Sequence, residues 1–385
     1  MNSILYVGMD VHTTNYTICT YEPEIDRISR QVQVEPDCRQ IKKYVDNLRK
    51  EMGKGRKVIC GYEAGCLGYS LYRQLTEIGI DCVILAPTTM ERPVSYPIKN
   101  DKRDAKGVAR CLATHGYSAV YIPTPEDEAV KEYIRMRDDH VDDLKRTKQQ
   151  ILALCIRHGK LFTEGKNYWT QKHLAWLRAI DFGNKQMNET LVEYLATYYW
   201  LDEKVKRLDH RIEELAMQAE YAERVKKLRC FLGIKSHTAL SLLVEVGDFK
   251  RFPNAESFAA YLGLVPGENS SSDKRRQLGI TKAGNKHLRR MLTEAAQCYN
   301  RSAIGYKSKV LREKQAGNSQ EVISYADKAN DRLRRKYHRM TFSGKNHNVT
   351  ITAIARELSC FIWGMMNDRI TQPTADLDRT CCLCE

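Results

Sequence analysis

The stretch "ILYVGMDVHTTNYTICTYE", residues 4–22, indicates the fold class of the first third of the chain. An apolar run ends at Asp10, a short polar link follows, and a second run rich in Thr, Ile and Tyr comes next. Short runs of β-branched and aromatic residues between polar links are typical of strands. The stretch therefore predicts two strands, and "RQVQVEP", residues 30–36, predicts a third.

Strands and helices alternate farther along the first region. "RKVICGYE" and "DCVILAP" are compact apolar runs that predict buried strands, and "LGYSLYRQLTEIG" between them has helical spacing. A second helix is expected from about Asn100, followed by a last strand at "AVYIP", residues 119–123. Hairpin strands first and alternating strands and helices afterwards predict an α/β domain of the ribonuclease H kind over residues 1–123.

The rest of the chain is predicted to be all-α. Residues 124–228 form a long helical, coiled-coil arm, and residues 229–370 form a basic helical domain with turns at Gly247-Asp248 and Pro266-Gly267. Residues 371–385 form a tail. The arm contains a heptad seam, which favours an antiparallel arm or a dimer contact. Its positions are Leu201, Val205, Leu208, Ile212, Leu215, Ala219 and Ala222.

Composition favours a nucleic-acid partner. The formal charge is +14, and such a surplus attracts polyanions through counterion release. The chain lacks an apolar run of membrane-spanning length and a signal peptide at its start, so a cytoplasmic protein without membrane contact is expected, associated with the nucleoid when it acts. Thirteen scattered cysteines fit a reducing compartment, and the final "RTCCLCE" has no partner pair at zinc spacing.

Four carboxylates are candidates for a metal site in the first region. Asp10 and Glu63 each end a predicted strand, and Asp101 and Asp104 lie three apart at the start of a predicted helix. In a ribonuclease H-like sheet the first and fourth strands are neighbours, and residues three apart share a helix face. Convergent carboxylates would hold two Mg²⁺ ions for phosphoryl transfer. Alternatively, the two helical acids only complement the helix dipole.

A second candidate segment contains three serines, Ser270 to Ser272, followed by basic residues. A serine could attack a phosphodiester while the cations hold the phosphate, but a flexible polar loop beside a basic surface has the same composition. The predicted nucleic-acid-binding residues are Lys274, Arg275, Arg276, Lys282, Lys286, Arg289 and Arg290, with Arg334, Arg335, Lys336 and Arg339 in a second cluster.

Several motifs together resemble the DEDD transposases of bacterial insertion sequences, which are related to Piv-type DNA invertases. They include "GMD", "YEAG", "KNDKRDA", "AAYLGLVPGENSS", "GITKAGNKHLRR" and "RRKYHRM", and the resemblance extends from residue 5 to about residue 368. It implies a RuvC-like domain with four acids, a helical arm, and a C-terminal transposase domain with a nucleophilic serine. Asp10, Glu63, Asp101 and Asp104 match the four acids.

The resemblance also implies a nucleophile and partners. The family serine lies five positions after a proline that matches Pro266, which selects Ser271, with Ser270 as the alternative if the segment slips by one. Members of the family act as recombinases guided by a bridge RNA that pairs with donor and target DNA. The resemblance implies a homo-oligomer, dimers assembling to a tetramer, in which the acids of one protomer face the serine of another.

The chain departs from the family pattern at two places. In "FLGIKSHTAL", Leu232 and Lys235 replace a Pro and a Gly, which puts a backbone contact to phosphate at that turn in question. Ser272 and Asp273 stand where glycine often follows the serine pair. Two other functions stay open: a metal-dependent RuvC-like nuclease or Holliday-junction resolvase without a covalent intermediate, and a non-enzymatic nucleic-acid-binding protein.

Overall fold

The computed structural model describes residues 4–52, 56–90, 101–268, 277–301 and 303–370. Within these ranges the side chains of Met52, Asp101, Lys102, Glu268 and Gln277 are outside the description. The chain divides into two compact units, Met1–Ile122 and Pro123–Glu385. Each unit has its own hydrophobic core, and each is described by itself below.

The first unit is built on a five-stranded sheet with the strand order β3-β2-β1-β4-β5. The pairs β1–β2 and β2–β3 are antiparallel, whereas β1–β4 and β4–β5 are parallel. This order confirms the predicted mixed α/β domain and the expected pairing of the first and fourth strands. The strands are β1 Ile4–Val11, β2 Tyr16–Glu22, β3 Arg27–Val34, β4 Lys57–Glu63 and β5 Cys82–Leu85.

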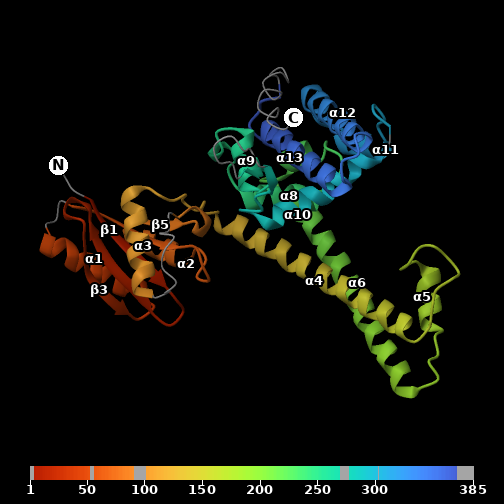
Figure 1. Ribbon diagram of the computed structural model, residues 1–385, viewed down its shortest axis with the longest axis horizontal. Helices are drawn as coiled ribbons and strands as arrows, with labels where there is room; N and C mark the ends of the chain where they lie inside the picture. Colours follow the sequence, from red (N-terminus) through yellow and green to blue (C-terminus); the bar gives the residue numbers. More distant parts are fainter. Residues whose placement is uncertain (1–3, 53–55, 91–100, 269–276, 302, 371–385) are drawn as a thin grey trace. The chain divides into compact units, whose positions relative to one another are not determined.

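Helices cover both faces of this sheet (Figure 1). Side chains alternate along a strand, so Val7 and Met9 of β1 point to one face and pack in the core that α1 (Cys38–Met52) and α2 (Ser70–Glu77) complete. Tyr6 points to the other face and packs against α3 (Asp101–Thr114). The sheet therefore has one deep core on the α1–α2 side and a single helix on the other side.

Two elements differ from the sequence-based expectation. α1 was missing from it, although Ile41, Val45 and Leu48 are buried at helical spacing. The last strand expected at 119–123 is reduced to one antiparallel bridge between Ala119 and Leu85. The following Pro123 lacks an N–H group, and the chain turns into a helix at Thr124, so the ladder cannot continue.

Two long helices, α4 (Pro125–Arg157) and α6 (Lys185–Ala216), form an antiparallel pair in the second unit (Figure 1). Arg137 Nε donates to Asp209 Oδ1 at 2.7 Å, and farther along α4 Lys148 lies over the ring of Tyr198, 5.5 Å from its centroid. The contact that lies later in α4 lies earlier in α6, so the two helices run in opposite directions. The short helix α5 (Gln171–Arg178) lies between them in the sequence and packs at the far end of the pair.

The heptad seam packs within the chain and is shorter than predicted. Leu201, Val205, Ile212 and Leu215 are buried. α6 ends at Ala216, so the last two seam positions, Ala219 and Ala222, fall outside it. Beyond the end of α6, Tyr221 is 1% exposed, and its hydroxyl donates to Asp127 Oδ1 of α4 at 2.7 Å. The chain that follows α6 is therefore bound to the start of α4 by a contact that the heptad spacing does not predict.

The C-terminal part is mostly helical, as predicted. Its core contains fully buried side chains from several helices, among them Phe231, Phe258, Leu292, Leu358 and Ile362. The helices are α7 Ala222–Leu228, α8 Ser236–Val246, α9 Ala255–Tyr261, α10 Lys286–Ala296, α11 Lys309–Gln315, α12 Gln320–Phe342 and α13 His347–Met366.

α13 is the one helix of the described ranges that is long and apolar enough to cross a membrane. Its apolar window is 72% buried inside the protein, and residues such as Ile354 and Leu358 have no exposed surface. The composition of α13 is therefore accounted for by its place in the middle of the helical core.

A two-stranded hairpin base lies between α9 and α10. β6 (Pro266–Glu268) pairs antiparallel with β7 (Gln277–Ile280). The turn predicted at Pro266-Gly267 is therefore wrong, because both residues belong to a strand. Proline fits at the first position of a short strand, where no ladder hydrogen bond from its nitrogen is needed.

Candidate functional site

Asp10 and Glu63 lie side by side at the carboxyl ends of two parallel strands. The register pairs Gly8 with Gly61 and Met9 with Tyr62, so each acid lies one residue beyond the last pair. Because side chains alternate, Asp10 is on the face of Gly8, and Glu63 is on the face of Gly61. The structure therefore brings two of the four predicted acids to one edge of the sheet, on the side that α3 covers.

α3 directs its first turn to the same edge. A Cβ atom on Gly8 would lie only 2.1 Å from the carbonyl oxygen of Ala105, so the helix backbone rests directly on β1. Tyr6, two residues earlier in the strand, packs against Cys111, which lies later in the helix. α3 consequently runs antiparallel to β1. Asp104, which precedes Ala105, is placed toward the end of β1 that Asp10 occupies.

Asp101 is the first residue of α3, one turn before Asp104. Its side chain is outside the described residues, so its part in the site stays a prediction.

A histidine that the sequence-based prediction missed belongs to this edge. His12 Nε2 lies 3.3 Å from Asp10 Oδ2, and its backbone N–H donates to the Asn15 carbonyl at 3.0 Å in the turn after β1. The side chain of Asp10 is 18% exposed, whereas that of His12 is 49% exposed. The signal in the sequence was the Asp-Val-His spacing, which places both side chains on one face of an extended strand.

The donor set at this edge suits a hard divalent cation. Mg²⁺ prefers oxygen ligands and commonly takes carboxylates, and Asp10, Glu63 and Asp104 supply them. Neighbouring carboxylates repel one another unless a cation or a proton intervenes. Among the side chains that the structure describes, no three His, Cys, Asp or Glu residues are close enough to enclose a metal ion together. Asp10, Glu63 and Asp104 belong to that set, so these three side chains do not enclose an ion by themselves in this structure, and Asp101, the fourth predicted ligand, is outside the set.

The serine segment lies between β6 and β7 in the sequence. Ser270, Ser271 and Ser272 are outside the described residues, as are Lys274, Arg275 and Arg276. The structure does describe the base on which the segment is mounted. Thr281 N donates to the Val265 carbonyl at 2.9 Å, which continues the pairing of the two strands toward the helical core.

Two glycines make this base compact. Gly263 and Gly284 have φ values of 66° and 82°, in the left-handed region that favours glycine. A Cβ on Gly263 would lie 2.0 Å from the Ala283 carbonyl oxygen, and one on Gly284 would lie 2.1 Å from that of Tyr261. The motifs on either side of the serine segment are therefore in direct backbone contact.

Glu245, at the end of α8, ties this support to the helical arm. The side chain of Glu245 is 4% exposed and accepts two bonds from Arg135 of α4, at 2.8 and 3.1 Å. It also accepts from Asn285 Nδ2 at 3.0 Å, and Asn285 caps α10 by accepting from Leu288 N. Burial acts to raise the pKa of Glu245, but the bonds and charge of Arg135, the charge of Lys131 and the bond from Asn285 together hold this pKa below its ordinary value.

The backbone of the turn in "FLGIKSHTAL" forms its contacts within the protein. Leu232 N donates to Asn330 Oδ1 at 3.0 Å. Gly233 has a φ of 79°, and a Cβ there would lie 2.3 Å from the Ala295 carbonyl oxygen. The amide of Leu232 is thus already bound, which agrees with the departure of this turn from the family pattern.

Comparison with known proteins assigns the chain to a family. A family model described as "Transposase", of the IS110 DEDD type, matches residues 7–156, and the model of the "Transposase IS116/IS110/IS902 family" matches residues 225–310. The transposase of insertion sequence element IS1533 from Leptospira borgpetersenii is 34% identical over 343 residues, which cover 88% of this chain and 97% of that protein. The chain belongs to the IS116/IS110/IS902 transposase family.

A more distant relative shares part of its length with this transposase. The transposase of element IS1111A from Coxiella burnetii is 27% identical over 243 residues, which cover 63% of this chain and 66% of that protein. The matched region 7–156 contains the acid edge, and 225–310 contains the whole hairpin and its support. Transposases cut and join DNA, and the DEDD type implies a divalent metal ion, commonly Mg²⁺.

Eight of the eleven predicted nucleic-acid-binding residues of the transposase lie in the described ranges, and they divide into two groups. Lys282, Lys286, Arg335 and Arg339 are exposed. Four others make internal contacts. Arg289 donates to the Leu262 carbonyl, Arg290 to Asp138, buried Arg334 to the Tyr306 carbonyl, and Lys336 to Glu357. These contacts give the second group a structural role, although Arg290 is itself exposed, and a nucleic-acid role stays a prediction for all eight residues.

The Glu245 contact of the transposase can be tested without altering either predicted half of the site. Glu245→Gln is expected to lower the free energy of unfolding by about 2 kcal/mol, because it removes a charge that accepts two bonds from Arg135 in a buried place. The measurement is urea denaturation followed by circular dichroism.

The matched control is Glu294→Gln on neighbouring α10. Glu294 is exposed, and the change should shift the unfolding free energy by no more than about 0.5 kcal/mol. Equal stability of the two variants would show that Glu245 does not tie the arm to the hairpin support.

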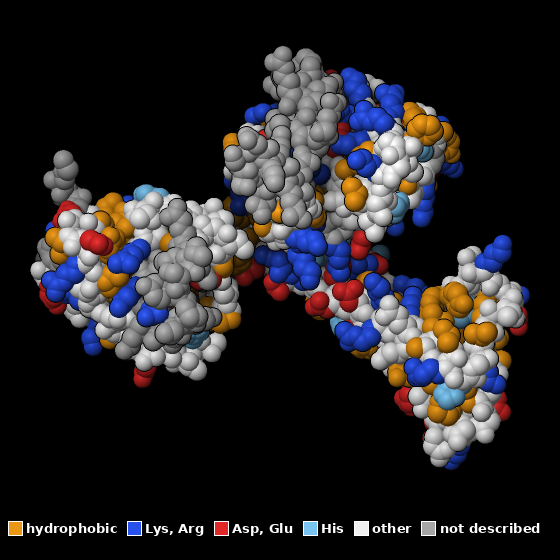
Figure 2. All heavy atoms as spheres, in the orientation of Figure 1, with side chains coloured by type: hydrophobic (Ala, Val, Ile, Leu, Met, Phe, Trp, Pro, Cys, Tyr) orange, Lys and Arg blue, Asp and Glu red, His pale blue; other side chains and the backbone are white. Residues whose placement is uncertain are grey.

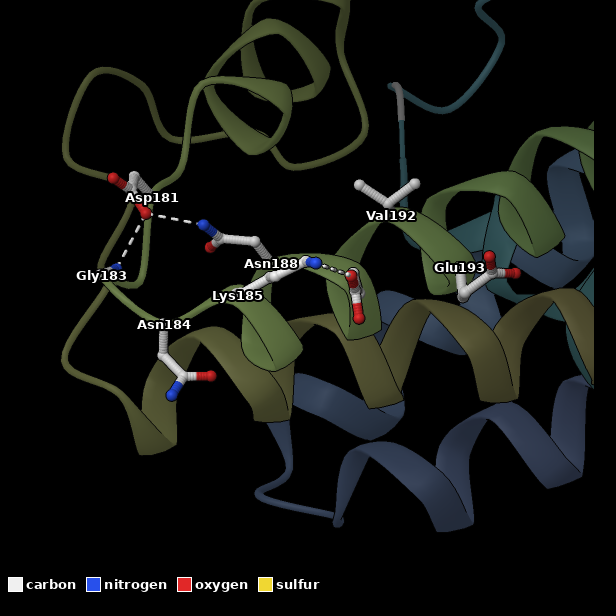
Figure 3. Close-up of a pocket in the computed structure, with 8 residues that line it drawn as sticks. Asp181, Gly183, Asn184, Lys185, Asn188, Val192 and Glu193 are labelled. Atoms are coloured by element: carbon white, nitrogen blue, oxygen red, sulfur yellow. Dashed lines mark hydrogen bonds and ion pairs between the residues drawn. The ribbon is translucent and has the colours of Figure 1, made fainter.

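An open pocket lies at the end of the arm, apart from the hairpin support in the same unit (Figure 3). Asp181 lines it and accepts bonds from Gly183 N at 2.8 Å and Asn188 Nδ2 at 2.7 Å. These bonds close the loop before α6, so the side chains of Asp181 and Asn188 are used in local structure. We do not assign it a role in DNA cutting.

Proposed function

We propose that this transposase cuts and rejoins DNA through a serine nucleophile, Ser271, assisted by a Mg²⁺ site formed by Asp10, Glu63, Asp101 and Asp104. The observation that carries the proposal is the convergence of strand ends and helix start at one sheet edge. It is supported by the backbone contacts at Gly263 and Gly284, which bring the motifs on either side of the serine segment together.

In the proposed reaction the Ser271 hydroxyl oxygen attacks the phosphorus of a DNA phosphodiester. The new bond from serine oxygen to phosphorus forms as the bond to the leaving strand breaks, and the serine proton ends on the departing oxygen. One phosphodiester is exchanged for another, so rejoining is the reverse step with a different strand end and needs no external energy source. Bound Mg²⁺ would supply charge stabilisation for the phosphoryl group.

The chain's own residues have separate roles in this scheme. Asp10, Glu63 and Asp104 would hold the cations at the sheet edge, with Asp101 as the fourth ligand. Exposed Lys282 and Lys286, beside the hairpin base, would position the DNA backbone. Arg289 and Asn285 would keep the support rigid through their bonds to the Leu262 carbonyl and Glu245.

From the family resemblance we further propose two partners besides DNA. A bridge RNA would pair with donor and target DNA and choose the sites of cutting. The acids of one protomer would act with the serine of another in a homo-oligomer, dimers assembling to a tetramer. The arm formed by α4 and α6 is the element proposed to let the acids of one protomer reach the serine of another.

The test is capture of a covalent protein–DNA adduct. Wild-type protein with Mg²⁺, guide RNA and a labelled DNA substrate is expected to give an adduct that survives denaturing electrophoresis. Ser271→Ala should abolish the adduct, and Ser270→Ala should preserve it, because only the first variant lacks the attacking oxygen.

Each other outcome points to a different conclusion. Loss of the adduct in Ser270→Ala alone would move the nucleophile by one residue. Mg²⁺-dependent cleavage to free ends, with no adduct and no effect of Ser271→Ala, would identify a metal-dependent nuclease or junction resolvase, the function that the DEDD family description also fits.

A further inference from the structure

A nearly fully exposed phenylalanine lies at the end of a basic helix. Phe342 is the last residue of α12 and is 97% exposed, more than any other large apolar side chain among the described residues. It lines a shallow open depression together with His338, Arg339 and Thr341. An aromatic ring in this position adds nothing to the core, so its contribution is to what lies outside the protein.

The backbone holds Phe342 in a fixed place. Gly344 has a φ of 77°, its N–H donates to the Thr341 carbonyl at 3.0 Å, and Lys345 N donates to the Met340 carbonyl at 3.0 Å. This pair of bonds is a Schellman motif, which ends the helix firmly. Two residues later Asn346 caps α13 by accepting from Asn348 N. The ring is therefore presented by a short, capped link between two packed helices.

The segment around Phe342 carries several basic residues, and no acidic residue close to it in the sequence balances their charge. No Asp or Glu occurs from residue 332 to residue 356. Glu357, the next acid, is 3% exposed in its side chain and is bound by Arg332 and Lys336. In the described part of the chain no carboxylate forms an ion pair with Arg335, Arg339 or Lys345.

The exposed residues form one stripe along α12. Arg335, His338, Arg339 and Phe342 are three and four positions apart, the spacing of neighbours on one helix face. Lys and Arg side chains gather over α12 in the view of Figure 2. The stripe thus carries two exposed arginines on one face of α12 and ends in an exposed apolar ring. We name it the Phe342 stripe.

We propose that the Phe342 stripe binds single-stranded nucleic acid, with Phe342 stacking on an unpaired base. Proteins that bind single strands combine a basic track for the phosphates with aromatic rings for the bases. Phenylalanine has no hydrogen-bonding atoms, so it would accept any base. In a duplex the base faces are already stacked and leave no partner for the ring.

A second copy of the chain is the less favoured occupant. In a two-fold contact the same patch meets itself, so the unneutralised charges of Arg335 and Arg339 would face equal charges. The inference rests on the proposed function only in that DNA recombination and an RNA guide both provide unpaired strands.

The experiment measures binding of fluorescein-labelled oligonucleotides by fluorescence anisotropy. The probes are a 20-nucleotide single-stranded DNA, a single-stranded RNA of equal length and a 20-base-pair duplex DNA. Phe342→Ala should weaken binding of both single strands about tenfold and leave the duplex within about twofold, because one base–ring contact is lost. Phe342→Trp, which keeps an aromatic ring at this position, should bind both single strands as tightly as the wild type.

Two controls separate stacking from charge and from exposed apolar area. Val349→Ala removes a 56% exposed apolar side chain in the same region and should leave all three affinities unchanged. Arg339→Ala should weaken single strands and duplex alike and reduce the dependence of binding on salt.

Unchanged single-strand binding in Phe342→Ala, or equal weakening for single strands and duplex, would overturn the proposal. A change in oligomeric state by analytical ultracentrifugation with unchanged binding would overturn it in favour of a second copy. Because Ser271→Ala should not alter these affinities, failure of the covalent-adduct test and failure of the stacking proposal are separate results.

Discussion

Replacing Asp10 with Asn is expected to lower the rate of DNA strand cutting by about 10³-fold. The substitution keeps the shape of the side chain but removes a negative ligand from the edge where Glu63 and Asp104 also lie. Loss of metal-dependent charge stabilisation costs several kcal/mol in the transition state, which corresponds to a rate loss of this size. The measurement is cleavage of a labelled DNA substrate at saturating Mg²⁺.

The control is Asp81→Asn in the same domain. The Asp81 side chain is 66% exposed and lies 3.7 Å from Lys57, away from the acid edge, so cutting should be unchanged. If Asp10→Asn cuts as fast as Asp81→Asn, the acid edge is not catalytic. Mixing Asp10→Asn with Ser271→Ala extends the test, because restored cutting would require an oligomer in which one protomer supplies the acids and another supplies the serine.

Gly8→Ala is expected to lower the free energy of unfolding by about 3 kcal/mol and to abolish most DNA cutting. The added Cβ would lie 2.1 Å from the Ala105 carbonyl oxygen and 2.4 Å from Ala109 N, both of which are backbone atoms. Relief of this clash requires α3 to move off β1, and overpacking of this kind costs up to about 3 kcal/mol. The same movement carries Asp104 away from Asp10.

Gly107→Ala gives the same chemical change within α3 itself. A Cβ on Gly107 meets no atom within 4 Å, so the substitution should stabilise the protein by about 0.5–1 kcal/mol through helix propensity. Thermal unfolding measures both variants. A Gly8→Ala protein as stable as wild type would show that α3 does not rest directly on β1.

Several features of the fold could be predicted from the sequence because their causes are local. Alternation of side chains and short apolar runs predicted the strands, and the D-x-x-D spacing at the start of a helix placed Asp101 and Asp104 on one turn. The helical character of residues 124–228 was predicted, and α4 and α6 lie in this region. α1 could have been predicted in the same way, since Ile41, Val45 and Leu48 follow the helical repeat.

Other features depend on contacts between distant segments. The heptad spacing continues in the sequence beyond Leu215, but α6 ends at Ala216, and Tyr221 is then buried and bonded to Asp127 of α4. The cations near residues 289 and 334 had the composition of a DNA-binding surface, yet Arg289, Arg290 and Arg334 bind groups within the protein. Composition cannot distinguish a solvent-exposed cation from one that a folded neighbour has already bound.

The sequence by itself determined the residue types of the acid edge, the alternation that puts Asp10 and Glu63 at strand ends, and the family to which the chain belongs. Only the tertiary structure decided that Gly8 and Gly61 pair across two strands and leave room for α3. It also decided that Gly263 and Gly284 bring the motifs flanking the serine segment into backbone contact. The physical reason is distance along the chain: periodicity acts over a few residues, whereas these contacts form only when packed elements meet.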